Sequence, residues 1–387
     1  MRNVVFPENF LFGAGICDYQ HFGGSVCDLP MIPAARHSSY FEQDFRLLKE
    51  LKLNAFRTSI EWARIEPEES KIDEDAVRFY HEYFAKLKST EVKTVVTLHH
   101  FTNPKWIHSH GGWLSEKTVE RFLRHVDFVS KEFDEYIDYY LTTNEPTIYC
   151  QLAYAAGDRG LPPFRKNRGE AVKCLENINE AVKRSYEIIH ENSKKAKVGV
   201  ANDTSVLQPW RRILKGSLIK LAPNLIIESP IEKWEGKYDF CGINYYCKMS
   251  SGNPIPYPEG LGKICGEFFQ KYRKPILITE NGLSNRDDRQ RTAYLLLHLK
   301  SLNDAMVFDK VNILGYCWWS FLHGYEWGLG YKPFFALVDV DIANSYRRAP
   351  TQTAYAYSRI IENHGFLFKL FEESCKLKSS LTFENWL

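Results

Sequence analysis

The stretch Ile276-Leu-Ile-Thr-Glu-Asn-Gly282 is an apolar, β-branched run that ends on Glu280, just before a chain-breaking glycine. The stretch Leu141-Thr-Thr-Asn-Glu-Pro146 has the same form and ends on Glu145, just before a proline. Runs of this kind predict buried strands, and a glutamate at the end of such a strand faces a cleft rather than bulk solvent. Two of them in one chain predict a paired-carboxylate site, which is the arrangement that glycoside hydrolysis uses.

Short apolar runs recur on both sides of these two stretches, and most are followed by a helical pattern. The candidate strands are Phe10–Gly15, Ala55–Ile60, Thr94–His99, Asp138–Thr143, Lys197–Ala201, Asp239–Asn244, Pro275–Thr279 and Ile313–Trp318. The amphipathic segments between them are Phe41–Leu51, Glu74–Lys88, Ser115–Glu132, Gly169–Ser193, Gly260–Tyr272 and Arg289–Ala305. Eight strand-then-helix units predict an α/β protein with a single (β/α)8 TIM barrel. Active sites of that fold lie at the C-terminal ends of the strands, where Glu145 and Glu280 fall.

We expect the barrel to occupy residues 1–365, because no low-complexity linker divides the chain. The Pro/Gly-rich stretch Ser251–Gly262 is expected to be a loop of the barrel, and a helix over about Thr351–Asn363 is expected to close it. The tail, residues 366–387, mixes an aromatic run with a polar stretch, and we expect it to make a docking or oligomer contact. Its lysines are balanced by glutamates, which disfavours a membrane-surface helix.

Composition excludes several classes of function. The 387 residues carry a formal net charge of +2, which argues against a nucleic-acid footprint. No run approaches the roughly 18 apolar residues of a membrane span, and the start of the chain lacks the apolar region of a signal peptide. The nine cysteines are odd in number and show no CxxC spacing, which favours free thiols in a reducing compartment. We therefore expect a cytoplasmic protein with no nucleic-acid partner and no membrane association.

The neighbours of the two glutamates predict different roles for them. Asn144 precedes Glu145 and can bind a substrate hydroxyl, so we expect Glu145 to be the acid/base, with its pKa raised by burial and by the other carboxylate. Glu280 is then expected to be the nucleophile, held ionised by the guanidinium of Arg57 and the hydroxyl of Tyr246. An isolated strand-end glutamate is more often a helix cap or a surface ion pair, so the prediction depends on the two occurring together.

Motifs at most of the strand ends resemble those of the family 1 glycoside hydrolases, the β-glucosidase and β-galactosidase group, between Phe6 and about Phe366. The stretches that carry the resemblance are Phe10–Gly13 with Tyr19-Gln20, Arg57–Pro67, Thr97–Phe101 with Pro104, Gly111–Leu114, Asn144–Pro146, Asp239–Tyr246, Tyr257–Leu261, Ile278–Gly282 and Trp319–Trp327. The His-His-Phe stretch and the Pro162-Pro163-Phe164 loop are similar to archaeal members of the family. Each motif alone is weak, but all of them in order are specific.

The resemblance implies a sugar-binding set. Gln20, His100, Asn144, Glu326 and Trp327 would bind the hydroxyls of the non-reducing sugar, and Trp319 would form the pocket floor by stacking on the sugar face. His100 alone could equally be a core histidine, and the adjacent pair His99-His100 could suggest a metal. Neighbours on a strand point to opposite faces, so we expect no metal and no cofactor. The acidic residue at position 326 favours an unphosphorylated sugar, because a carboxylate would repel a phosphate.

The chain departs from the family pattern in its loops. The segment between Ala201 and Asp239 and the loop Cys27–His37 are shorter than usual, and we expect a more open entrance on the leaving-group side. His323-Gly324 stands where the family has Asp-Asn. The expected function is a retaining, exo-acting β-glycosidase on small β-glycosides or oligosaccharides, with terminal β-glucosyl, β-galactosyl or related residues as substrates. A transglycosidase with the same catalytic residues and a non-catalytic sugar-binding protein are the alternatives, and a homo-oligomer is an open expectation.

Overall fold

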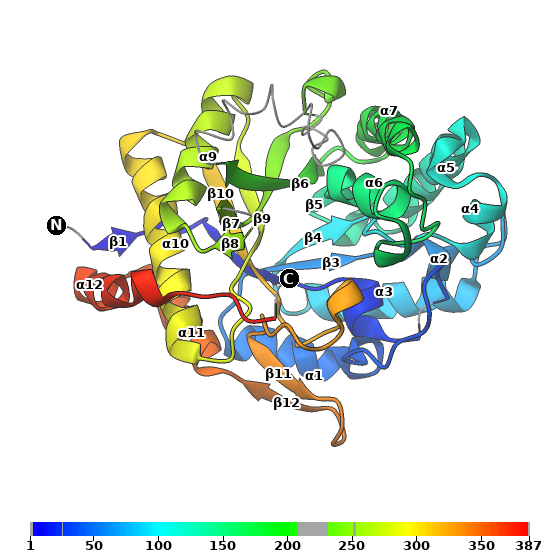
Figure 1. Ribbon diagram of the computed structural model, residues 1–387. Helices are drawn as coiled ribbons and strands as arrows, with labels where there is room; N and C mark the ends of the chain where they lie inside the picture. The colour runs from blue at the N-terminus through cyan, green and yellow to red at the C-terminus, as the bar shows by residue number, and fades with distance from the viewer. Residues whose placement is uncertain (1–2, 25, 208–230, 251–252, 386–387) are drawn as a thin grey trace.

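The computed structural model describes residues 3–24, 26–207, 231–250 and 253–385. Within them, eight parallel strands form a closed barrel in the order β6-β5-β4-β3-β2-β10-β9-β7, and β6 pairs with β7 to complete the ring (Figure 1). The barrel strands are β2 (Leu11–Gly15), β3 (Ala55–Ser59), β4 (Lys93–Thr97), β5 (Tyr139–Asn144), β6 (Lys197–Leu207), β7 (Phe240–Ser250), β9 (Ile276–Asn281) and β10 (Ile313–Trp319). The prediction of a (β/α)8 TIM barrel is confirmed.

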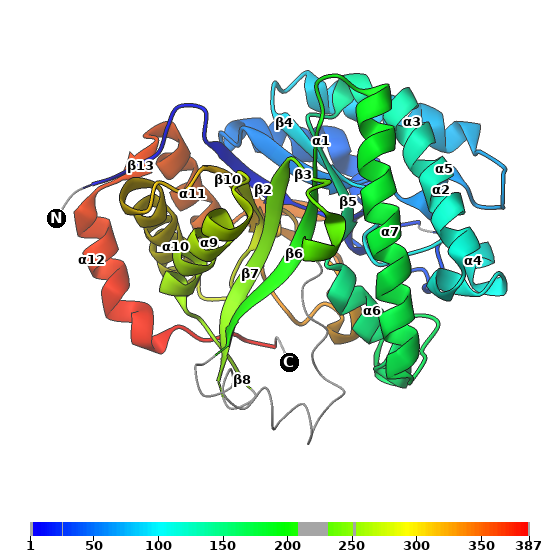
Figure 2. The same cartoon turned by 90° about the horizontal axis from the view of Figure 1, so that it is seen from above.

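Helices cover the outside of the strands, as Figures 1 and 2 show. The long ones are α1 (His37–Glu50), α3 (Glu74–Lys88), α5 (Glu116–Glu132), α7 (Arg168–Asn192), α9 (Pro258–Tyr272), α10 (Asp288–Phe308) and α11 (Gln352–Glu362). Shorter ones lie in the loops: α2 (Trp62–Ile65), α4 (Lys105–Ser109) and α6 (Pro146–Tyr154). Several of the long helices are capped at their N-terminus by a polar residue. The side chains of Asp73, Asn167 and Asp287 accept hydrogen bonds from backbone amides of the first turn.

Two apolar clusters form most of the core, and a third, small one lies around Trp319. Inside the barrel, one apolar side chain from most strands forms a small cluster of Leu11, Ala55, Val95, Leu141, Ala201, Phe240 and Leu277. Outside it, a much larger cluster fills the space between the strands and the helices. The interior is therefore packed rather than hollow, and the polar side chains at the C-terminal ends of the strands lie above this packed layer.

Strand β6 is longer than predicted. The sequence indicated an end at Ala201, but β6 continues to Leu207 and stays paired with β7, with Asp203 opposite Asn244. Figure 2 shows both strands running past the ends of their neighbours. The polar residues that follow Ala201 resemble a loop, and only the pairing with a strand some 40 positions away (for example, 203 with 244) keeps them extended.

The stretch expected to be a loop, Ser251–Gly262, is partly regular. Residues 253–255 form β8 (Asn253–Ile255), which pairs antiparallel with β7, and α9 begins at Pro258. Proline is favourable in the first turn of a helix, because the amide hydrogen that it lacks would have no partner there. Residues 251–252 and 208–230 lie outside the described residues, so the more open entrance stays a prediction.

The tail contacts the barrel itself. β13 (Gly365–Phe366) pairs with β1 (Val4–Val5), and α12 (Phe368–Leu377) packs against α10. Farther on, the amide of Glu384 donates to the carbonyl of Ser284 at 2.7 Å. A contact with a second chain stays a prediction.

Candidate functional site

Glu280 lies near the end of β9 with both carboxylate oxygens held. A nitrogen of Arg57, on β3, donates to one oxygen, and the hydroxyl of Tyr246, on β7, donates to the other at 2.7 Å. Arg57 is fully buried and also donates to the carbonyl of Thr279 at 3.1 Å. A carboxylate with a guanidinium and a hydroxyl as donors is stabilised in its ionised form, which is what a nucleophile requires.

Glu145 is the residue that turns the chain from β5 into α6. Its φ of 41° lies in the left-handed region, and its amide donates to the carbonyl of Ala201 at 2.7 Å. Burial raises the pKa of Glu145 well above its ordinary value, and the charges of Glu280 and Asp203 raise it further. These surroundings favour the protonated form of Glu145, which is the form that a general acid requires.

One hydrogen-bonded chain connects the two glutamates. The side-chain amide of Asn244 donates to Glu145 Oε1 at 2.8 Å and to Asn144 Oδ1 at 3.2 Å. The same oxygen of Asn144 accepts from Arg57 Nη2 at 2.6 Å, and Arg57 bonds Glu280. The hydroxyl of Thr279 donates to Asn244 Oδ1 at 2.6 Å, which fixes the amide with its NH₂ group toward Glu145. Within this single network the proton is favoured on Glu145, while Glu280 accepts hydrogen bonds on both oxygens.

The residues predicted to bind sugar lie together beside this network. Gln20 Nε2 donates to Glu326 Oε2 at 3.1 Å, and the indole of Trp319 donates to Glu326 Oε1 at 3.1 Å. The His100 ring lies nearly parallel to the rings of Trp319 and Trp327, with centroids 5.9 and 6.1 Å away. Burial raises the pKa of Glu326 to about 8.

Several buried polar atoms in this group have no partner among the described residues. They are Oε1 of Gln20, Nδ1 of His100 and Nε of Arg57. A buried polar atom without a hydrogen bond costs about 1–3 kcal/mol, so such atoms indicate a place where a ligand or water binds. Gln20 contacts Glu326, and His100 lies against Trp319 and Trp327, so the free atoms of these two residues fit a polyhydroxy ligand. His99 points elsewhere and contacts Asn103 at 3.1 Å.

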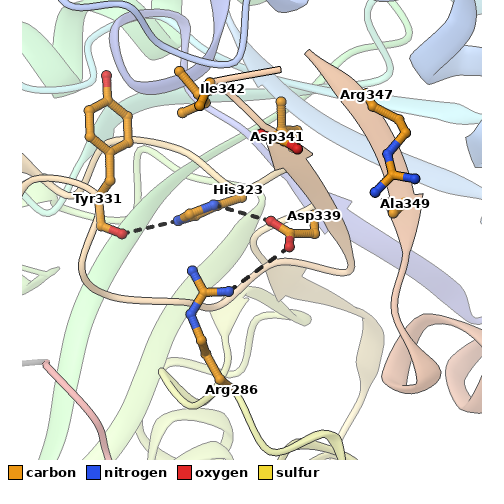
Figure 3. A pocket seen from close by; sticks show the side chains of 10 residues that line it. Arg286, His323, Tyr331, Asp339, Asp341, Ile342, Arg347 and Ala349 are labelled. Atoms are coloured by element: carbon orange, nitrogen blue, oxygen red, sulfur yellow. Dashed lines mark hydrogen bonds and ion pairs between the residues drawn. The ribbon is translucent and has the colours of Figure 1, made fainter. Parts of the chain in front are cut away.

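His323, at the position where the family resemblance leads us to expect aspartate, holds the loop that carries Glu326 and Trp327 in place. His323 Nε2 lies 3.2 Å from the carbonyl of Tyr331, and its Nδ1 lies 3.3 Å from Asp339 (Figure 3). Arg286 is 3.9 Å from the other oxygen of Asp339, and the hydrogen bond from His323 lowers the pKa of that carboxyl. These side chains line a hollow of about 510 Å³. Its ten lining residues include neither Glu145 nor Glu280, so this hollow is separate from the reacting groups.

Asn244 and Asp203 were not predicted as site residues. Asn244 belongs to a motif used for the resemblance, but its link to both glutamates depends on the pairing of β7 with its neighbours. The sequence predicted that this strand ends at Ala201, so Asp203 fell in the loop expected after it. Within the described residues, no three or more His, Cys, Asp or Glu side chains are grouped to bind a metal ion, and no helix is long and apolar enough to cross a membrane.

Comparison with known proteins decides the family. The sequence matches the family described as glycosyl hydrolase family 1 over residues 32–218 and 243–366, which is most of the chain. The chain belongs to glycosyl hydrolase family 1. The resemblance inferred from the motifs is confirmed.

Two plant relatives and one archaeal structure show how this family 1 chain compares. It is 31% identical to the chloroplastic beta-glucosidase-like SFR2 of Oryza sativa subsp. japonica over 358 residues, 83% of this chain and 55% of that protein. It is 30% identical to the chloroplastic galactolipid galactosyltransferase SFR2 of Arabidopsis thaliana over 357 residues, 83% of this chain and 57% of that protein. The chain thus spans a little over half the length of these relatives. The beta-glycosidase from Pyrococcus horikoshii superposes with a TM-score of 0.84 at 27% identity, covering 96% of this chain and 98% of that one.

Proposed function

We propose that this family 1 chain is a retaining, exo-acting β-glycosidase that hydrolyses terminal non-reducing β-glucosyl, β-galactosyl or related residues. The observation that carries the proposal is the single network in which Glu145 holds a proton while Glu280 accepts hydrogen bonds on both oxygens. This difference between two carboxyls at one barrel mouth is what a double-displacement reaction requires.

In the first step, Glu280 attacks the anomeric carbon while Glu145 gives its proton to the departing glycosidic oxygen. The bond to the leaving group breaks, the alcohol leaves, and the sugar stays as an ester of Glu280. In the second step, Glu145, now ionised, takes a proton from water as the water oxygen attacks the anomeric carbon. The ester bond to Glu280 breaks, and the product keeps the β configuration.

Sugar recognition is assigned to Gln20, His100, Asn144, Glu326 and Trp327, with Trp319 as the stacking surface. Above about pH 8, where the Glu326 carboxyl is ionised, Glu326→Ala is expected to lower kcat/KM for an aryl β-glycoside by about 10²-fold, because each hydrogen bond to a charged group contributes about 1.5–3 kcal/mol. Glu326→Gln, which keeps one acceptor oxygen, should lose less. Steady-state kinetics on glucoside, galactoside, fucoside and mannoside substrates would measure both losses.

The same measurement tests the preference for unphosphorylated sugars. An aryl 6-phospho-β-glycoside should not be turned over by the wild type, since Glu326 offers a phosphate no positive charge and repels it once the carboxyl ionises near pH 8. A kcat/KM for the phosphorylated substrate above that of its parent glycoside would remove Glu326 from the sugar site.

Transglycosylation is the second candidate, because one relative is named a galactolipid galactosyltransferase. The test is to supply an aryl β-galactoside as donor with a galactolipid in mixed micelles as acceptor, and to count released phenol and free galactose. Hydrolysis predicts equal amounts of the two at every acceptor concentration. Free galactose that falls below phenol as the galactolipid rises, with an oligogalactolipid appearing, would make the chain a transferase.

A non-catalytic sugar-binding protein is disfavoured, because sugar binding alone needs no network of this kind between the two glutamates. The partners we propose are small β-glycosides or oligosaccharides, without cofactor or metal. A cytoplasmic location, a homo-oligomer, and a barrel of residues 1–365 followed by a tail remain proposals from the sequence.

A further inference from the structure

Asp203 lies on the inner face of the barrel, one layer above the apolar interior. Ala201 belongs to the interior cluster, and residues two positions apart in a strand point to the same face. The pairing of β6 with β7 is regular here, with Ala201 opposite Gly242 and Asp203 opposite Asn244. On the other side of β6, the amide of Glu145 donates to the carbonyl of Ala201. Asp203 therefore lies at the barrel mouth, on the strand between the one that ends at Glu145 and the one that carries Asn244.

The described neighbours of Asp203 do not neutralise its negative charge, which therefore acts on Glu145. Both amide hydrogens of Asn244 are used by Glu145 and Asn144, so Asn244 has none for Asp203. The guanidinium of Arg57 is bonded to Glu280 and Asn144. Within the described part of the chain, no cation forms an ion pair with Asp203. Burial raises the pKa of Asp203 to about 6, so the group is ionised at neutral pH.

We propose that Asp203 is a positioning residue that acts through Glu145, where its negative charge holds the proton until the glycosidic oxygen takes it. The inference rests on the proposed roles of Glu145 and Glu280. In the free enzyme, Glu280 and Asp203 both oppose ionisation of Glu145, and Arg57 favours it. Tyr246, on β7, and His100, on β4, also face this mouth; their surroundings keep the tyrosine protonated and the histidine uncharged.

Asp203 matters most in the second half of the reaction. Once Glu280 is bonded to the sugar, its charge is gone, and Asp203 is the carboxylate among the described residues that still opposes ionisation of Glu145. An ionised Glu145 next to another negative charge is a stronger base than an isolated one, so it removes the proton of water, or of an acceptor hydroxyl, more readily.

The test is the pH profile of Asp203→Asn. Its alkaline limb in kcat/KM should move to lower pH by about one unit, because a like charge near Glu145 has been removed. Below about pH 6, where Asp203 is protonated in the wild type, the two profiles should approach each other. Asp203→Glu should restore the wild-type limb. Asp309→Asn, at an exposed position after α10, is the matched control and should leave the profile unchanged.

A titration that needs no turnover separates this inference from the proposed function. Carbon-13 labelling of glutamate carboxyls, with Glu145→Gln to assign the signal, gives the pKa of Glu145 directly. A lower value in Asp203→Asn supports the inference even if no aryl glycoside is cleaved. An unchanged value and an unchanged limb in a variant that melts like the wild type overturn it, and a loss confined to KM would make Asp203 a binding group instead.

Discussion

Replacing Glu280 by alanine is expected to lower kcat/KM for an aryl β-glycoside by about 10⁴-fold or more, as removal of a nucleophile does in other enzymes. The ester to the sugar cannot form without this carboxylate, and Arg57 is left buried without its anion. Added azide should enter the space of the missing carboxylate and attack the same face of the sugar. The product would then be the glycosyl azide of inverted configuration, identified by NMR.

The control for this variant is Glu132→Ala. Glu132 ends α5, away from the barrel mouth, and its carboxylate lies 2.7 Å from the His81 ring. It should keep wild-type kinetics. Because an unpaired Arg57 could weaken the fold, the melting temperature of Glu280→Ala has to be measured alongside, with Glu280→Gln as the isosteric variant. Full activity in a folded Glu280→Ala would refute the double-displacement mechanism.

Glu145→Ala is expected to discriminate between leaving groups. Substrates with a poor leaving group should lose about 10²- to 10⁴-fold in kcat/KM, the usual contribution of a positioned acid. Substrates with an acidic phenol need little protonation, so their first step should stay close to the wild-type rate and the second step should become limiting. The measurement is a burst of phenol followed by a slow steady state.

The anomer formed with azide again shows which face of the sugar the missing carboxyl occupied. In Glu145→Ala it should accelerate turnover by replacing water at the glycosyl-enzyme, and the product should be the glycosyl azide of retained configuration. The opposite stereochemistry from that of the Glu280 variant is the decisive comparison. If both variants gave the same anomer, the roles assigned to the two glutamates would be wrong.

Most of the barrel was predictable because its signals are local. A buried parallel strand is a short apolar run, and the two glutamates follow such runs directly. For the same reason, Arg57 could be named from its place in the second predicted strand and Tyr246 from its place just past the sixth. The role of each of these residues is indicated by the sequence within a few positions of it.

What could not be predicted depends on pairing between distant segments. Asn244 links both glutamates only because β7 lies beside β6 and β9, and the polar continuation of β6 is extended only because β7 is there. Likewise, the fastening of the Glu326 loop by His323 needs Asp339 from β11 (Val338–Asp341), which pairs with β12 (Arg347–Pro350). A sequence pattern contains none of these contacts.

The acidic groups Asp203 and Glu326 give the barrel mouth a charge that changes between about pH 6 and pH 8. Asp203 ionises near pH 6 and Glu326 near pH 8, so the mouth becomes more negative across this interval. A sugar mimic with a protonated ring nitrogen is then attracted more strongly as the pH rises, until the nitrogen loses its own proton. A neutral mimic of the same shape lacks that attraction. The barrel thus responds to the charge of an inhibitor separately from its shape, and comparing such a pair at several pH values would tell the two contributions apart.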